Sequence, residues 1–179
     1  PWHCSIVHAL LTFQTRAVEP LIKSLRNECW SNRDYWEDDG SHTIYDAIGA
    51  LVQIGEPAIE PLIKVLEERE DNTLLTQTAA ALGEIGDKRA VDPLLRVLEG
   101  GWDNYHLLKQ SALALGKIGD KRAVEPLIRL LRTCPNLDYW SESAIKDALM
   151  KLDVIAKPIR KNGVGKIVGY EFDTKTTAD

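Results

Sequence analysis

Apolar residues recur at helical spacing along most of the chain. Near its centre, one apolar stripe consists of Leu75, Ala79, Leu82 and Ile85, and the next, at i, i+3, i+4 and i+7, consists of Val91, Leu94, Leu95 and Leu98. Gly86 and Asp87 stand between the two stripes. Glycine suits the left-handed position at the end of a helix, and aspartate caps the start of the next one. The pattern predicts two short helices joined by a tight turn.

This two-helix unit repeats along the chain. Residues 80–95 recur at 113–128, 33 residues later, while a looser copy lies at 50–63 and weaker copies lie at 9–22 and 148–159. Each copy carries a proline at the same place, which a helix tolerates in its first turn: Pro20, Pro61, Pro93, Pro126 and Pro158. Such a period is typical of a solenoid, in which each unit packs against its neighbours. We therefore expect an all-α superhelix (solenoid) of about five two-helix repeats over residues 1–161.

The first connection and the C-terminal end depart from the period. The first two marker prolines stand 41 residues apart, against 32 or 33 elsewhere, so eight or nine extra residues fall within 27–40. Residues 162–179 lie outside the repeat. We expect them to form a C-terminal extension, partly extended around residues 166–172 and partly disordered.

Two glycines occupy the middle of predicted helices. Gly83 and Gly116 lie at equivalent places in the two central repeats, although glycine costs about 1 kcal/mol relative to alanine inside a helix. The expected reason is a neighbouring helix that approaches closely.

The two central copies share the sequence Ala-Leu-Gly-x-Ile-Gly-Asp-Lys-Arg-Ala-Val-[Asp/Glu]-Pro-Leu, at residues 81–94 and 114–127. This motif resembles the HEAT-like repeats of the phycobilisome-lyase (PBS lyase) type. The resemblance implies a curved stack of antiparallel helix pairs. It implies little about activity, because such repeats serve many roles. The second repeat departs from the motif, since Glu56 and Pro57 replace Asp-Lys-Arg, and the fifth lacks the Asp-Lys-Arg sequence in its turn.

Composition and charge narrow the choice of function. No apolar run approaches the ~18 to 20 residues that cross a membrane, and the N-terminus lacks the basic start and apolar stretch of a signal peptide. Three scattered cysteines, Cys4, Cys29 and Cys134, predict free thiols and a cytoplasmic location. The net charge of −5 disfavours nucleic acid as a partner, because phosphate binding relies on clustered Lys and Arg.

Aromatic residues gather in or beside the connections between repeats. They are Trp30, Tyr35, Trp36, Trp102, Tyr105, Tyr139 and Trp140, and acidic residues accompany them at Glu37, Asp38, Asp39, Asp103 and Asp138. Tryptophan and tyrosine are the side chains that most often dominate protein interfaces. One hypothesis is therefore a binding edge for a basic or amphipathic partner. The alternative is that the rings plug gaps between helix ends while the acids cap the next helix.

Charged residues repeat as well. Three residues after each marker proline lies a base, in the series Lys23, Lys64, Arg96, Arg129 and Lys161, and one residue before it lies an acid in Glu19, Glu60, Asp92 and Glu125. This basic ladder is either a stripe for an acidic partner or a solvated face paired within each helix by contacts at i and i+4. The Asp-Lys-Arg turns at 87–89 and 120–122 predict hydrogen bonds between adjacent repeats.

Sequence motifs for catalysis are absent. His3, His8, His42 and His106 are scattered and none precedes a Glu, and no zinc, phosphate-loop or nucleophile signature occurs. We therefore expect a non-enzymatic scaffold for protein–protein interaction, with no cofactor or metal and a protein partner of unknown identity. The alternative, drawn only from the repeat type, is a bilin lyase or a chromophore-handling subunit. A HEAT-like DNA glycosylase is disfavoured by the acidic charge.

Overall fold

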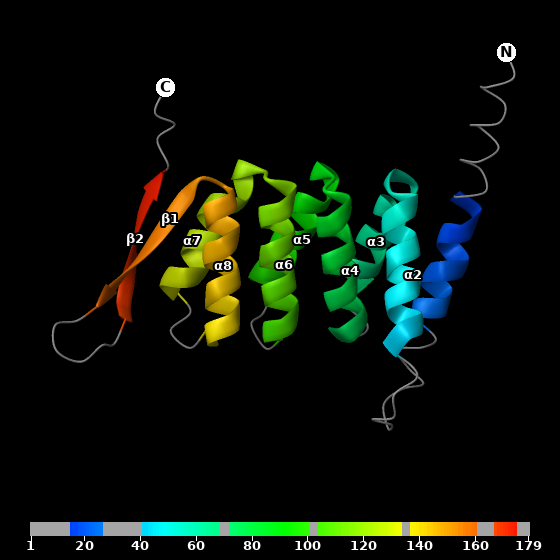
Figure 1. Cartoon of the computed structure of the whole chain (residues 1–179), viewed down its shortest axis with the longest axis horizontal. Coiled ribbons are helices and arrows are strands. Elements are labelled where there is room, and N and C mark those ends of the chain that lie inside the picture. Colours follow the sequence, from blue (N-terminus) through cyan, green and yellow to red (C-terminus); the bar gives the residue numbers. More distant parts are fainter. Residues whose placement is uncertain are drawn as a thin grey trace, which may run out of the picture.

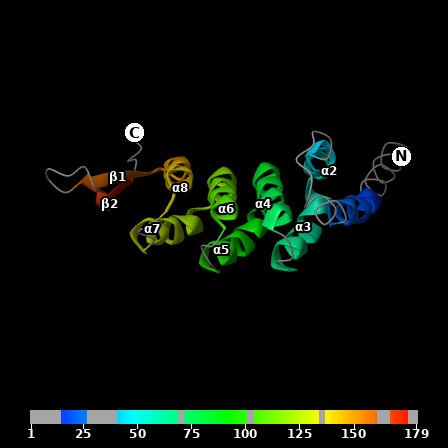
Figure 2. The same ribbon diagram turned by 90° about the horizontal axis from the view of Figure 1, so that it is seen from below.

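Helices stacked in two layers form most of the structure. The computed structural model describes residues 15–26, 41–68, 72–100, 104–133, 137–160 and 167–174. The first helices of successive repeats are α2 (Ser41–Ile54), α4 (Asn72–Ile85), α6 (Tyr105–Ile118) and α8 (Tyr139–Lys151). The second helices are the helix over 15–26, α3 (Glu56–Glu68), α5 (Val91–Glu99) and α7 (Val124–Thr133). Figures 1 and 2 show these two sets as two rows, which confirms the predicted all-α solenoid.

The Asp-Lys-Arg turns join the two helices of the central repeats. In each, the Asp side chain caps a single 3₁₀ turn, η1 (Lys88–Ala90) or η2 (Lys121–Ala123), by accepting the backbone N–H of the Arg two residues later, at 2.8 Å for Arg89 and 2.9 Å for Arg122. The preceding Gly86 and Gly119 adopt φ of 76° and 74°, which glycine reaches without strain. These turns end just before α5 and α7, so the marker proline falls in the first turn of each helix as expected.

The second repeat differs because it lacks this turn. Helix α3 begins directly at Glu56, one residue after Gly55, so Pro61 lies inside the helix instead of in its first turn. A proline there cannot donate to the carbonyl four residues earlier. Helix α3 therefore lacks one internal hydrogen bond at Pro61.

The mid-helix glycines allow adjacent first helices to pack closely, as predicted. A Cβ added at Gly83 would lie 2.6 Å from the Cα of Ala114, and one added at Gly116 would lie 2.7 Å from the Cα of Ala148. The equivalent residue of α2 is Val52, and α2 packs less extensively against α4 than α4 packs against α6. In α8 the equivalent residue is Met150, whose side chain is 51% exposed because no further first helix follows it.

A continuous apolar core lies between the two layers. Its fully buried side chains include Leu82 and Leu94 of one repeat and Leu115 and Leu127 of the next, as the apolar stripes predicted.

Among the described helices, none is long and apolar enough to cross a membrane.

The C-terminal end contains a β-hairpin. The prediction that residues around Ala156 and Pro158 form the second helix of a fifth repeat is wrong, because they belong to β1 (Val154–Arg160). This strand pairs antiparallel with β2 (Ile167–Thr174), which confirms the extended segment expected near 166–172. The segment lacks the Gly-Asp-Lys-Arg turn, and successive side chains of β1 differ in burial as in a strand, Val154 being buried and Ile155 exposed.

The hairpin covers the open end of the helical stack. Strand β1 packs against α8 and β2 against α7, beside which both strands lie in Figure 1. The Phe172 ring centroid lies 5.2 Å from the Arg132 guanidinium, and the Tyr170 ring centroid lies 4.9 Å from the Lys146 ammonium. Partial burial raises the pKa of Tyr170, and its hydrogen bond to Glu142 raises it further. The hairpin thus takes the place of the next repeat.

Candidate functional site

Three exposed aromatic side chains lie at the N-terminal ends of adjacent first helices. Tyr105 is the first residue of α6, and Tyr139 and Trp140 are the first two residues of α8. Their exposed fractions are 44%, 74% and 66%. Elsewhere in the described residues, Met150 and Ile155 are the other large apolar side chains that are exposed.

Capping hydrogen bonds determine where both helices begin. The Asn104 side chain accepts the backbone N–H of Leu107 at 3.1 Å and so starts α6. The Asp138 carboxylate accepts the backbone N–H groups of Trp140 at 3.1 Å and Ser141 at 3.4 Å and so starts α8. Hydrogen bonding from Ser141, together with the Trp140 N–H, holds the pKa of Asp138 below its ordinary value although partial burial raises it. This acid therefore has the capping role that one of the two hypotheses gave it.

An open hollow of about 470 Å³ lies between the N-terminal ends of α6 and α8. It is lined by Tyr105, His106 and Lys109 from α6 and by Asp138, Trp140 and Ser141 from α8. The buried Ser141 hydroxyl donates to the Tyr105 carbonyl oxygen at 3.2 Å and ties the two helices together below the rings. The Tyr139 and Trp140 rings meet edge to face, with centroids 5.5 Å apart. We call this feature the aromatic hollow.

The aromatic hollow is lined by one lysine, Lys109, and one carboxylate, Asp138. The Lys109 ammonium lies 5.7 Å from the centroid of the Trp140 ring, a cation–π contact. Among the described residues it forms no ion pair. Asp138, the one carboxylate that lines the hollow, is committed to capping α8. Asp138 is the one acid of the predicted edge that lies within the described residues, so the acidic character of that edge stays a prediction.

The structure brings together part of the predicted aromatic edge. Tyr105 and Trp140 line one hollow, and the Tyr139 ring contacts Trp140 beside it. The other predicted members, Trp30, Tyr35, Trp36 and Trp102, and the acids Glu37, Asp38, Asp39 and Asp103, lie outside the described residues. Sequence reasoning missed Lys109 as a member of the site. Its spacing of i+4 from Tyr105, which places both on one side of α6, is the signal that could have found it.

Two residues of the basic ladder, Arg96 and Arg129, form ion pairs with the preceding second helix. Arg96 pairs with Glu67 of the preceding second helix, and Arg129 pairs with Glu99 at 3.9 Å. Lys23 and Lys64 are exposed and form no ion pair within the described part of the chain, and Lys161 lies outside it. The pairs that the structure gives for Arg96 and Arg129 thus join successive repeats, a geometry that the sequence did not predict.

The arginines of the Asp-Lys-Arg turns also pair with acids of the preceding repeat. Arg122 pairs with Asp120 in its own turn and with Asp92 of the preceding repeat, at 3.2 and 2.9 Å. Arg89 likewise pairs with Asp87, at 2.9 Å, and with Glu56 and Glu60, at 3.4 and 3.5 Å. The predicted hydrogen bonds between adjacent repeats are therefore present. Their acceptors in the preceding repeat are acids of the second helix.

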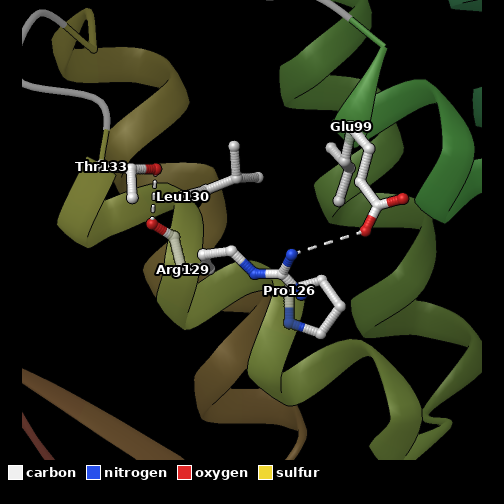
Figure 3. Close-up of a pocket in the computed structure, with 6 residues that line it drawn as sticks. Glu99, Pro126, Arg129, Leu130 and Thr133 are labelled. Carbon is white, nitrogen blue, oxygen red and sulfur yellow. Dashed lines mark hydrogen bonds and ion pairs between the residues drawn. The ribbon is translucent and has the colours of Figure 1, made fainter.

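A second type of hollow lies between successive second helices. Between α5 and α7 it measures about 320 Å³ and is lined by Leu98, Glu99, Pro126, Arg129, Leu130 and Thr133. Figure 3 shows the Arg129–Glu99 pair spanning its mouth and the Thr133 hydroxyl donating to the Arg129 carbonyl, at 2.8 Å. A similar hollow of about 260 Å³ lies between the helix over 15–26 and α3. Because Leu98 and Leu130 are buried and the charges at the mouth are paired, this groove offers less to a partner than the aromatic hollow.

Metal-ligand clusters do not occur in the described ranges: no three His, Cys, Asp or Glu side chains come together there in a way that could hold a metal ion.

Comparison with known families agrees with the architecture. Residues 59–146 match the family model for HEAT repeats, and residues 44–68 match the model for the PBS lyase HEAT-like repeat. A search of curated proteins found no match. The matched segments include α3 to α7, the Asp-Lys-Arg turns and the close-packed glycines. The chain therefore contains HEAT-like repeats, whose matches together span residues 44–146.

Proposed function

We propose that this chain is a repeat scaffold that binds another protein through the aromatic hollow. The observation that carries the proposal is the exposure of Tyr105, Tyr139 and Trp140 around one opening. Tyrosine and tryptophan bury a large area while losing few torsional degrees of freedom, which is why they are concentrated in interface hot spots.

The size of the exposed area supports the proposal. A tryptophan buries about 150 to 250 Å² when it is covered, so Trp140 at 66% exposure leaves on the order of 100 to 150 Å² open to water. At about 25 cal/mol per Å², covering it would contribute about 2.5 to 4 kcal/mol before the costs of association are subtracted. One such anchor is enough to matter in a protein interface.

The alternative, a structural plug, fits these side chains less well. A ring that seals a gap between helices loses most of its exposure, whereas Tyr139 and Trp140 keep 74% and 66%. The side chains that do seal the junction of α6 and α8 are smaller and buried, including Ser141 and Leu108. The Tyr139 and Trp140 rings are therefore not part of the buried contact between α6 and α8.

The test compares two substitutions on one helix. Trp140→Ala removes the proposed anchor, and Met150→Ala removes an exposed apolar side chain from the other end of α8. Tagged protein and both variants are used to capture partners from the native host, with quantitative mass spectrometry as the readout. We expect one set of proteins to be lost with Trp140→Ala and kept with Met150→Ala, and both melting temperatures to stay within about 2 °C of the parent.

Two results would contradict the proposal. If Trp140→Ala lowers the melting temperature by several degrees while the surviving folded protein still captures its partners, Trp140 is a plug. If every partner is retained by a stable Trp140→Ala protein, the hollow is not the binding site. The PBS lyase match describes a type of repeat, so the bilin-lyase alternative stays a prediction. A shifted absorption band on mixing the protein with bilin would favour it.

A further inference from the structure

We propose that the aromatic hollow accepts an extended peptide segment of another protein in which an apolar side chain lies next to a carboxylate. This inference rests on the proposed function and specifies the chemistry of the partner. The apolar side chain would pack between the Tyr105 and Trp140 rings, and the carboxylate would pair with Lys109.

The ion pairing of nearby lysines sets Lys109 apart. On the same two helices, Lys117 of α6 pairs with Glu84, and Lys146 of α8 pairs with Glu142. Lys109 lies at the hollow and holds no carboxylate among the described residues. Lys151 also has no carboxylate partner among the described residues. It lies at the opposite end of α8, however, and does not line the hollow. Among the described residues, Lys109 is thus a cation at the hollow that has no carboxylate partner.

The surroundings of Lys109 favour an anionic guest over a cationic one. Its ammonium already interacts with the Trp140 ring at 5.7 Å, so a guest cation would compete for that ring and be repelled by Lys109. The Asp138 carboxylate also lines the hollow, but it accepts backbone N–H groups through Oδ2 and forms no salt bridge with Lys109. The N-terminal ends of α6 and α8 add positive potential in the same place.

The shape of the hollow favours a peptide anchor. Its volume of about 470 Å³ lies within the range of binding pockets for small groups, roughly 300 to 1,000 Å³. It is open, and it is flanked by the exposed Tyr139 ring, which extends the apolar surface beyond Trp140. An extended segment can therefore insert one side chain and continue over the neighbouring rings.

The experiment is a fluorescence anisotropy titration with three labelled peptides of equal length. Each has Leu-Phe at its centre, flanked on both sides by two Glu residues, two Gln residues or two Lys residues. With the parent protein we expect the Glu peptide to bind at least fivefold more tightly than the Gln peptide, the Lys peptide to bind most weakly, and the preference to shrink as salt is raised.

Substitutions then assign the preference to individual residues. Lys109→Gln should bring the Glu and Gln peptides to within twofold of each other, and Lys109→Glu should make the Lys peptide the tightest. Trp140→Ala should weaken all three peptides by fivefold or more. The matched controls Lys151→Gln and Met150→Ala should leave all three affinities unchanged, and melting curves confirm that each variant is folded.

The outcomes separate this inference from the proposed function. Equal binding of the three peptides, tighter binding of the Lys peptide, or no binding of the Glu peptide up to millimolar concentration would overturn the inference alone, provided that Trp140→Ala still abolishes partner capture. A single-stranded oligonucleotide that binds more tightly than the Glu peptide, and is lost with Trp140→Ala, would assign the hollow to base stacking and overturn both. Partner capture unaffected by Trp140→Ala would also overturn both.

Discussion

The close packing of first helices can be tested with one substitution made at two places. Alanine at Gly83 would place a methyl group 2.6 Å from the Cα and 2.7 Å from the Cβ of Ala114. The nearest of these atoms belongs to the backbone of a buried helix, so α4 and α6 must move apart to accept it. Alanine at Gly49, inside α2, would meet nothing within 4 Å.

The two variants should change stability in opposite directions. Replacing glycine by alanine inside a helix stabilises by about 1 kcal/mol, and overpacking a close contact costs about 1 to 3 kcal/mol, or more where the backbone must shift. Gly49→Ala gains only the first contribution, so its melting temperature should rise by about 2 to 4 °C. At Gly83 the collision should outweigh the gain, leaving a loss of up to about 2 kcal/mol.

Urea unfolding followed by circular dichroism measures both changes in the free energy of unfolding. The slope of unfolding free energy against urea should be the same in the parent and both variants, because the exposed area on unfolding changes little. If Gly83→Ala were as stable as Gly49→Ala, α4 and α6 would not approach as closely as described. The explanation of the mid-helix glycines would then be refuted.

Two further predictions concern the core and the turns. Leu115 is fully buried, so Leu115→Ala should cost about 2 to 5 kcal/mol in urea unfolding, and a loss below about 0.5 kcal/mol would place this side chain at the surface. Hydrogen bonds from Arg89 and Arg122 hold the pKa values of Asp87 and Asp120 below the ordinary 3.8. Their stabilisation is therefore complete above that value and is lost as the pH falls through the lowered pKa. The double variant Asp87→Asn, Asp120→Asn should be less stable than the parent at pH 7, and the gap should narrow as the pH falls below 3.8. A stability gap that does not narrow with falling pH would contradict this origin.

Much of the fold follows from the sequence because the repeat signals are local and redundant. The apolar stripes around Leu82 and Leu94, the Asp-Lys-Arg turn and the marker proline all indicate the same two helices, and each signal occurs more than once. The C-terminal end was predicted wrongly because Pro158 kept the repeat spacing while the turn before it had changed. The turn that precedes the second helix in the central repeats is missing here, and residues 154–160 form a strand instead.

The site was predicted less completely because it depends on contacts between repeats. The aromatic residues could be chosen from their position in connections, but nothing local to Asp138 shows whether its carboxylate faces solvent or caps α8. One of the two interpretations of the basic ladder paired Arg96 with an acid four residues earlier, and the structure gives a pair with Glu67 on the preceding second helix. Which of several acids a long side chain reaches depends on the stacking of helices, which spacing in one helix does not give.

The most direct test of a binding role for the aromatic hollow is the dissociation constant of a purified partner for three forms of the protein. The parent, Trp140→Ala and Met150→Ala are titrated with that partner by isothermal calorimetry under the same conditions. Binding through the hollow predicts a loss of more than about 1 kcal/mol, roughly fivefold in affinity, for Trp140→Ala and no change for Met150→Ala. Equal affinities for all three folded proteins would contradict it.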